Sequence, residues 1–123
     1  MTFSAPVPRF RMFDVAKAKE FYVDFLGFTL DWEDSFGPDA PVYLQLSRDA
    51  CVLHLSEHFG DCCPGGAIVI PLDDIDTYQQ GLLAKQYRHA RPGRAEDMPW
   101  GARTLTITDP FGNRITFSQP ISS

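Results

Sequence analysis

The chain has 123 residues, which is enough for one domain of ordinary size and too few for two. Its 44% hydrophobic and 22% charged residues exclude wholesale disorder. The net charge of −5 argues against binding to duplex nucleic acid, whose phosphates require a basic surface. The same acidic balance is compatible with a neutral or cationic small ligand.

The sequence predicts a cytoplasmic protein with reduced thiols and no membrane partner. No apolar run approaches the roughly 18 residues that a membrane-spanning helix needs, and the N-terminus lacks the apolar segment of a signal peptide. Cys62 and Cys63 are adjacent, and adjacent cysteines form a disulfide only with strain. No Lys or Arg lies within several positions to lower their pKa, so no catalytic role is expected for them.

The first half of the chain predicts one helix followed by three strands. Asp14 is a typical N-cap residue, and the apolar side chains after it recur at helical spacing as far as Leu26. Gly27 supplies the left-handed conformation that ends such a helix. The strands are expected at residues 28–33, 42–46 and 51–56.

The second half repeats this plan. Asp73 or Asp74 is expected to cap a second helix. The turn at 109–113 suits a hairpin, because Pro110 fits the second turn position and Gly112 tolerates a positive φ. The strands of this half are expected at residues 67–70, 103–108 and 114–117.

The two halves align with a regular offset. Asp14 lies 60 positions before Asp74, and His54 lies 62 positions before Thr116. Each half is therefore predicted to be a βαβββ module, the first over about 5–60 and the second over about 65–120. Neither half can bury both faces of its own sheet, so the two are expected to pack as a single α+β domain over residues 1–123.

Two motifs are specific enough to suggest a family. The first is D-x-x-x-A-x-x-F-Y-x-x-x-L-G over residues 14–27, and the second is D-P-x-G-N over residues 109–113. Together they resemble the glyoxalase/bleomycin-resistance/dioxygenase superfamily, also called vicinal oxygen chelate proteins. The resemblance extends from Pro6 to about Pro120, and it implies a curved sheet that encloses a cleft.

Two further features resemble the bleomycin-resistance branch of that superfamily. The segment Met98-Pro99-Trp100-Gly101-x-Arg103 is similar to one in that branch. Pro8 resembles the proline at which the N-terminal arm of that branch crosses to a partner subunit. The resemblance therefore implies a homodimer, with or without an exchanged arm, and ligand clefts at the subunit interface. The strand at 67–70 lacks the aromatic ring that these binders usually present, so the identity of the bound drug is left open.

Enzymes of the superfamily hold a divalent metal with side chains from the first and last strands of each module. These positions fall on Val7 and His54 in the first half and on Ala67 and Thr116 in the second. Only His54 is a good ligand, whereas an open catalytic site needs about three. The resemblance therefore favours no metal, no cofactor and no catalytic residue. A metal-dependent glyoxalase- or dioxygenase-type enzyme stays the alternative.

Without a metal, aromatic side chains define the expected cleft, because aromatic faces stack on flat heterocycles and attract cations. The predicted function is the sequestration of a flat, cationic antibiotic, as in bleomycin resistance proteins. A scaffold or accessory protein without a small ligand is a further alternative. Trp32 is equally compatible with a ligand contact and with a position in the core. His54 is equally compatible with a ligand contact and with a hydrogen-bonded position in the sheet. The candidate ligand contacts are Trp32, Phe36, His54, Phe59 and Trp100.

Overall fold

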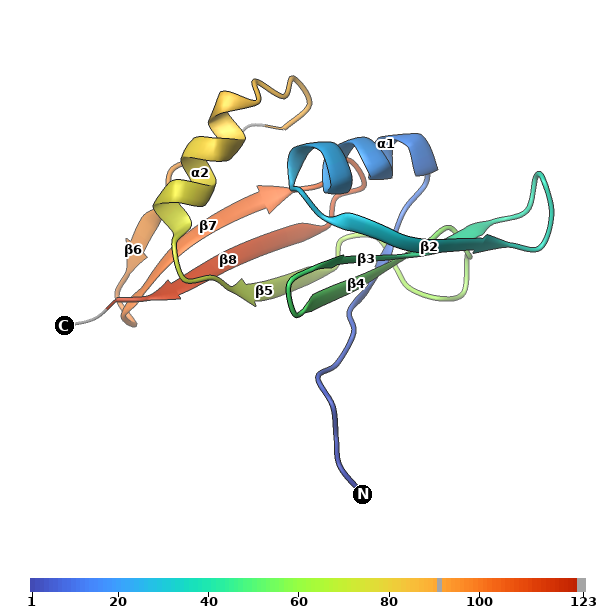
Figure 1. Ribbon diagram of the computed structural model, residues 1–123, viewed down its shortest axis with the longest axis horizontal. Coiled ribbons are helices and arrows are strands. Elements are labelled where there is room, and N and C mark those ends of the chain that lie inside the picture. Colours follow the sequence, from blue (N-terminus) through green and yellow to red (C-terminus); the bar gives the residue numbers. More distant parts are fainter. Residues whose placement is uncertain (91, 122–123) are drawn as a thin grey trace. The chain divides into compact units, whose positions relative to one another are not determined.

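The computed structural model describes residues 1–90 and 92–121, which fall into two compact units, Met1–Pro64 and Gly65–Ser123 (Figure 1). Each unit contains one four-stranded mixed sheet and one helical segment. This confirms the predicted α+β class and the two βαβββ-like repeats. No helix in the described part of the chain is long and apolar enough to span a membrane.

The first unit has the strand order β1-β4-β3-β2, with β1 parallel to β4 and the other neighbours antiparallel. Figure 1 shows its helix lying along one face of this sheet. In chain order its elements are β1 (Arg9–Arg11), α1 (Val15–Lys19), η1 (Glu20–Phe25), β2 (Thr29–Ser35), β3 (Val42–Arg48) and β4 (Cys51–Ser56).

The predicted helix forms, but it changes type halfway. Asp14 caps it as expected, because its carboxylate accepts a hydrogen bond from the backbone N–H of Lys17 at 3.0 Å. The α-helix α1 then widens into the π-helix η1, whose wider turn brings neighbouring apolar residues to the buried side. The buried side chains of this segment are Ala18, Phe21, Tyr22, Phe25 and Leu26.

Gly27 ends the helix for two separate steric reasons. Its φ of +85° is in the left-handed region, which favours glycine. A Cβ at this position would also lie 2.5 Å from Nη1 of Arg48. That guanidinium donates to the carbonyl oxygen of Leu26 at 2.8 Å, so it cannot move aside without losing a hydrogen bond.

Alternation along the central strands gives the first sheet one apolar and one polar face. The apolar face is buried and carries Leu44, Leu46, Leu53 and Leu55. The intervening positions of β3 and β4 carry Tyr43, Gln45 and His54 on the opposite face, because successive side chains of a strand point to opposite sides. The candidate site is built on this second face.

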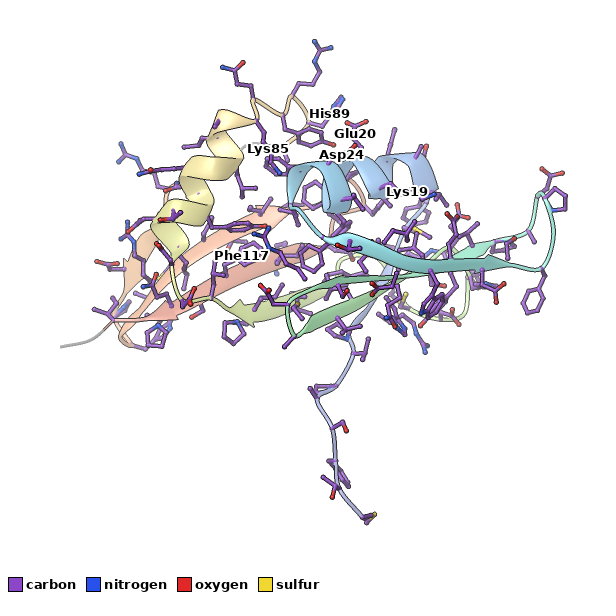
Figure 2. The ribbon with its side chains drawn as sticks, in the orientation of Figure 1. Lys19, Glu20, Asp24, Lys85, His89 and Phe117 are labelled. Atoms are coloured by element: carbon purple, nitrogen blue, oxygen red, sulfur yellow. The ribbon has the colours of Figure 1, made fainter. Side chains whose placement is uncertain are left out.

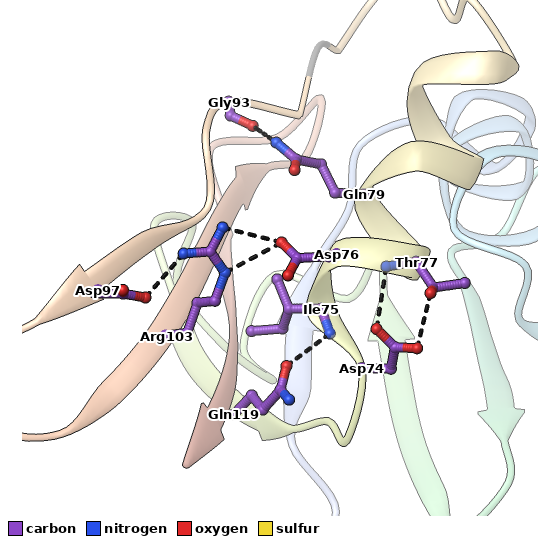
Figure 3. Close-up of polar contacts among 9 residues, drawn as sticks. All are labelled: Asp74, Ile75, Asp76, Thr77, Gln79, Gly93, Asp97, Arg103 and Gln119. Carbon is purple, nitrogen blue, oxygen red and sulfur yellow. Dashed lines mark hydrogen bonds and ion pairs between the residues drawn. The ribbon is translucent and has the colours of Figure 1, made fainter. Parts of the chain in front are cut away.

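The second unit has the same strand order, β5-β8-β7-β6. Strand β6 was not predicted, because three residues are too few to show an alternating pattern. Asp74 rather than Asp73 caps the helix, and its carboxylate accepts from the backbone N–H and the hydroxyl of Thr77 (Figure 3). The elements are β5 (Ala67–Pro71), α2 (Ile75–Ala84), β6 (Glu96–Met98), β7 (Ala102–Thr108) and β8 (Arg114–Pro120).

The strand register preserves the offset of the sequence repeat. In the first unit Arg9 of β1 lies opposite His54 of β4. In the second unit Val69 of β5, 60 positions after Arg9, lies opposite Thr116 of β8, 62 positions after His54. Equivalent positions in the two sheets therefore differ in chemistry. Arg9 and His54 occupy them in the first unit, and Val69 and Thr116 occupy them in the second.

The D-P-x-G-N turn stabilises the second sheet. One oxygen of the buried Asp109 carboxylate accepts from the backbone N–H groups of Phe111 and Asn113, each at 2.8 Å. The Asn113 amide donates to the other oxygen at 2.8 Å and accepts from the N–H of Gly66 at 3.1 Å. The motif therefore joins the β7–β8 hairpin to the start of β5, a structural role.

Arg103 connects the helix of the second unit to its edge strand. Its Nη2 lies 2.9 Å from Oδ1 of Asp76 on α2, and its Nη1 lies 2.8 Å from Oδ1 of Asp97 on β6 (Figure 3). Phe117 of β8, labelled in Figure 2, contacts Tyr78 of α2 with ring centroids 5.0 Å apart. Polar and aromatic contacts thus both fasten α2 to its sheet.

Replacement of Gly27 by alanine should lower the free energy of unfolding by about 1–2 kcal/mol, the cost of a left-handed non-glycine residue, with a further loss from the contact with Arg48. Gly81→Ala is the matched control. Gly81 lies inside α2 and a Cβ there meets nothing within 4 Å, so this change should stabilise by about 0.5–1 kcal/mol. Urea denaturation measures both, and effects of the same sign would contradict the role assigned to Gly27.

Candidate functional site: an aromatic face on the first sheet

Trp32 reaches the polar face of the first sheet because of a β-bulge in β2. The register between β2 and β3 shifts between Leu30, which lies opposite Leu46, and Trp32, which lies opposite Gln45. Without this irregularity, strand alternation would turn Trp32 to the same buried face as Leu30. The indole is instead 44% exposed, so Trp32 is not a core residue.

Trp32 packs against two rings from the neighbouring strands. The ring of Tyr43 is nearly parallel to the indole, with centroids 5.9 Å apart and an interplanar angle of 13°. His54 meets the indole in an edge arrangement at 5.5 Å and meets Tyr43 in the same way at 5.1 Å. We call Trp32, Tyr43 and His54 the aromatic platform.

Hydrogen bonds join five side chains of this face into a continuous polar row. Nε of Arg9 donates to the Tyr43 hydroxyl at 2.9 Å, and that hydroxyl lies 2.6 Å from Nδ1 of His54. Nε2 of His54 lies 2.9 Å from Oε1 of Gln45, whose Nε2 donates to Asp31 at 3.0 Å. The polar row therefore consists of Arg9, Tyr43, His54, Gln45 and Asp31.

The Asp31 carboxylate determines which group donates and which accepts along the polar row from Gln45 to Tyr43. A carboxylate only accepts hydrogen bonds, so Gln45 presents its NH₂ group to Asp31 and its carbonyl oxygen to His54. His54 must then donate from Nε2, which leaves Nδ1 to accept from the Tyr43 hydroxyl. Burial lowers the pKa of His54, and the positive charge of Arg9 lowers it further, so the neutral imidazole is favoured.

The residues at the superfamily's metal positions do not fit a metal. Both ring nitrogens of His54 are engaged in the polar row, and the residue opposite it in β1 is the cation Arg9. Val7 and Ala67 have no ligating atom in their side chains, and Thr116 is a poor ligand. Within residues 1–90 and 92–121, no three or more His, Cys, Asp or Glu side chains are grouped to hold a metal ion.

A cavity of about 410 Å³ opens beside the aromatic platform, where the ends of β2 and β3 meet the loop that follows β4. Aromatic rings and two carboxylates line it, which suits a flat molecule with a positive charge. We call it the platform cavity. Its lining residues are Trp32, Asp34, Ser35, Phe36, Tyr43, His58 and Asp61.

Two residues hold the loop after β4 against the sheet. The N–H of Glu57 donates to the carbonyl of Val42 at 2.9 Å, and its carboxylate accepts from the N–H of Val42 at 3.0 Å. The fully buried Ser56 donates from its hydroxyl to Asp61 at 2.6 Å and accepts from the N–H of His58 at 3.0 Å. Ser56 thereby positions both loop residues that line the platform cavity.

The structure brings together some of the five predicted contacts and leaves others apart. Trp32 and Phe36 line the platform cavity, and His54 lies in the platform next to it. Phe59 is 92% exposed and is not part of the lining. Trp100 belongs to the second unit, where it is 72% exposed in the turn between β6 and β7.

Pro8 immediately precedes β1, and its carbonyl accepts from the backbone N–H of His54 at 2.9 Å. The residues before it lie outside any helix or strand, and Met1, Phe3 and Val7 among them are exposed. The chain therefore enters the sheet at Pro8 beside the aromatic platform, after an apolar N-terminal segment.

The acidic stretch around Trp32 is divided among three roles. Asp31 ends the polar row. Glu33 instead forms an ion pair with Lys19 of α1, with Oε1 of Glu33 2.6 Å from Nζ of Lys19, a residue labelled in Figure 2. Only Asp34 of this stretch lines the platform cavity. The second carboxylate there is Asp61, which the loop after β4 brings to the site.

Tyr43 and Gln45 are the other functional candidates that the sequence interpretation missed. Both alternate with buried leucines along β3, so their outward direction was predictable. Their partnership with His54 was not, since it depends on which strands are neighbours in the sheet. A tyrosine on the same face as a candidate histidine is the signal that could have identified them.

Cys51 and Cys62 do not have the environment of nucleophilic thiols. Burial raises the pKa of Cys51. Burial also raises the pKa of Cys62, and Asp61 adds to this increase, although Arg11 and Arg9 oppose it. A nucleophilic thiol requires a lowered pKa, so the raised pKa of Cys51 and of Cys62 does not favour a thiolate at either position.

The chain belongs to the glyoxalase superfamily, because the family model described as "Glyoxalase superfamily protein" matches residues 1–122. This confirms the resemblance that the two motifs indicated. No curated protein sequence matches the chain.

Solved structures with the same fold include antibiotic-binding proteins. TnmS3, an antibiotic binding protein from Streptomyces sp. CB03234, is 27% identical, with a TM-score of 0.78 over 98% of each chain. A glyoxalase/bleomycin resistance protein from the same organism is also 27% identical, with a TM-score of 0.71 over 93% of this chain and 100% of that one. The bleomycin-binding protein of bleomycin-producing Streptomyces verticillus, complexed with copper(II)-bleomycin, is 25% identical, with a TM-score of 0.70 over 100% of this chain and 99% of that one.

Ser56→Ala should lower the free energy of unfolding by about 1–3 kcal/mol, because it leaves the N–H of His58 and the carboxylate of Asp61 without their partner. Ser47→Ala is the matched control, since it removes a hydroxyl that donates to Asp31 at an exposed site, and it should cost less than about 0.5 kcal/mol. Urea denaturation of both variants measures the difference. Equal losses would contradict the role of Ser56 in holding the loop.

Proposed function

We propose that this protein binds a flat, cationic small molecule of antibiotic type and sequesters it without chemical conversion. The observation that carries the proposal is the platform cavity, where the partly exposed indole of Trp32 lies beside the carboxylates of Asp34 and Asp61. The platform supplies a stacking surface, and the carboxylates supply the complementary charge. The proposed ligand contacts are Trp32, Phe36, His54, Phe59 and Trp100, with Tyr43, Asp34 and Asp61 added.

The physical basis of the affinity is stacking assisted by charge. One stacked aromatic ring contributes about 1–3 kcal/mol to the binding of a flat base. A cation near an aromatic face gains further attraction from the ring quadrupole. The net charge of −5 favours the approach of a cation over that of an anion. A stacking surface accepts flat ring systems of different chemistry, so the proposal names a class of ligand.

The functions of these relatives support this class of ligand. TnmS3 is an antibiotic binding protein, and the Streptomyces verticillus protein binds copper(II)-bleomycin. Sequestration needs no metal and no nucleophile, in agreement with the engaged nitrogens of His54. The metal-dependent alternative lacks a suitable donor set among residues 1–90 and 92–121. The scaffold alternative does not account for the aromatic platform beside an acidic cavity.

The proposal includes a homodimer. Phe3 is 88% exposed in the N-terminal segment, and Trp100 is also largely exposed in the second unit. Aromatic side chains such as these are enriched at protein–protein interfaces. A second copy is the proposed partner, with the segment before Pro8 as the arm that crosses to it and Trp100 as a contributor to the ligand cleft.

The first test is a fluorescence titration of metal-stripped protein with copper-free and copper(II)-loaded bleomycin, and with the planar cation ethidium. Trp32 and Trp100 are the two tryptophans of the chain, so Trp100→Phe leaves Trp32 as the single reporter. We expect saturable quenching at one ligand per chain. Absence of saturable quenching by all three ligands would contradict the proposal.

Trp32→Ala should weaken the ligand that binds by about 1–3 kcal/mol, the contribution of one stacked ring, and Trp100→Ala tests the second unit in the same way. Leu83→Ala is the matched control, because Leu83 is an exposed apolar residue of α2 outside the proposed contacts. Calorimetric titration measures all three. Unchanged affinity in Trp32→Ala would remove Trp32 from the site.

The dimer is tested by size-exclusion chromatography with light scattering. We expect twice the chain mass of 13.8 kDa. Deletion of the segment before Pro8 should shift the equilibrium toward the single chain, since the arm contributes apolar contact area. A wild-type mass of one chain at micromolar concentration would contradict the dimer without affecting the platform cavity.

A further inference from the structure

We infer that His54 is a positioning residue of the proposed binding site. Its neutral imidazole, with the hydrogen on Nε2, holds the Tyr43 ring and through it the Trp32 indole in the orientation that stacks on a planar ligand. The inference rests on the proposed function and adds a requirement to it. Binding at this face needs the deprotonated imidazole, so acidification releases the ligand.

The position of His54 in the sheet gives it this role. It has neighbours on each of the other three strands. Arg9 lies opposite it in the register of β1, and Tyr43 and Gln45 of β3 are its hydrogen-bond partners. Trp32 of β2 meets its ring in an edge arrangement. Tyr43 stacks on the indole, and Gln45 lies opposite Trp32 in the register. Loss of the imidazole therefore frees both neighbours of the indole together.

Protonation breaks the polar row at its centre. A proton taken from solvent onto Nδ1 converts the acceptor of the Tyr43 hydroxyl into a donor. The Tyr43 oxygen, 2.9 Å from Nε of Arg9 and 2.6 Å from Nδ1 of His54, then faces two charged donors, and its own hydrogen must turn to another acceptor. The imidazolium also lies near the guanidinium of Arg9, and the two like charges repel each other.

Imidazole is the side chain whose charge changes nearest to neutral pH, and His58 is a second imidazole close to the aromatic platform. His58 lines the platform cavity, so a variant must separate its effect from that of His54. The charged and titratable neighbours are Arg9 on β1, Asp31 and Asp34 on β2, Tyr43 on β3, and His58, Asp61 and Cys62 in the loop after β4.

The direction of the pH effect follows from the lowered pKa of His54. The folded state holds this proton less tightly than the unfolded chain, whose histidine has the ordinary pKa of 6.5. The neutral platform is therefore fully present above pH 6.5 and is lost as the pH falls through the folded pKa. Folding stability follows the same course, so the experiment must be run where the protein stays folded.

The test is the binding of ethidium between pH 8 and pH 5, because the charge of this planar cation does not change over that range. Since only the neutral fraction binds, the apparent Kd should stay constant at high pH and then rise by about tenfold per pH unit below the His54 midpoint. His54→Asn keeps an acceptor for Tyr43 and cannot be protonated, so its apparent Kd should not change between pH 8 and pH 5. His54→Ala should bind weakly throughout.

His58→Gln is the control for the second imidazole, and it should keep the wild-type pH dependence. The inference is overturned if His54→Asn retains that dependence or if His58→Gln abolishes it. Circular dichroism at each pH confirms that every variant remains folded. A structural role alone would change stability in His54→Asn without removing the pH profile.

Histidine nitrogen NMR of the ligand-free protein separates this inference from the proposed function. We expect the Nε2–H tautomer of His54 at pH 8, and we expect the Trp32 indole and Tyr43 ring signals to shift with the His54 midpoint on acidification. If ethidium binds at no pH, the proposed function fails, and the NMR titration still decides the role of His54. A different tautomer, or ring signals that ignore the His54 titration, would overturn it.

Discussion

The irregularity between Leu30 and Trp32 in β2 is the constraint on which the rest of the site depends. A regular strand would bury the indole beside Leu30, since side chains two apart share a face. The bulge turns Trp32 onto the polar face, where Tyr43 and His54 are already directed by the alternation of β3 and β4. Asp31, at the same irregularity, ends the polar row that holds these rings. One local departure from strand geometry therefore assembles both the stacking surface and its support.

The two repeats share a register and differ in chemistry. Arg9 and His54 pair in the first sheet at the places that Val69 and Thr116 occupy in the second. In the second unit the polar side chains serve mainly to hold elements together, as the Asp109 turn and Arg103 show. The duplicated architecture thus supports a specialised first unit, because strand pairing depends on backbone geometry and leaves the outward side chains free to differ.

The role of His54 shows how a superfamily position acquires different chemistry. A histidine ligand must offer a free ring nitrogen to the metal. Here a tyrosine hydroxyl and an amide oxygen engage both nitrogens, and a guanidinium lies close by. These neighbours favour a fixed, neutral imidazole that orders other side chains. This arrangement supports the proposed recognition through preorganised rings, since neither ring nitrogen of His54 is free for a metal.

Local signals in the sequence determined most of the fold. Asp14 and Asp74 were predictable as caps and Gly27 as a helix end, because each depends on a few neighbouring residues, and the repeat offset identified two βαβββ-like modules. Tertiary structure decided the face on which Trp32 lies, the partnership of His54 with Tyr43 and Gln45, and the arrival of Asp61 at the cavity. These features depend on a register shift, on strand order and on a loop anchored by Ser56. Such contacts join residues whose spacing along the chain carries no periodic signal, so only the folded sheet brings them together.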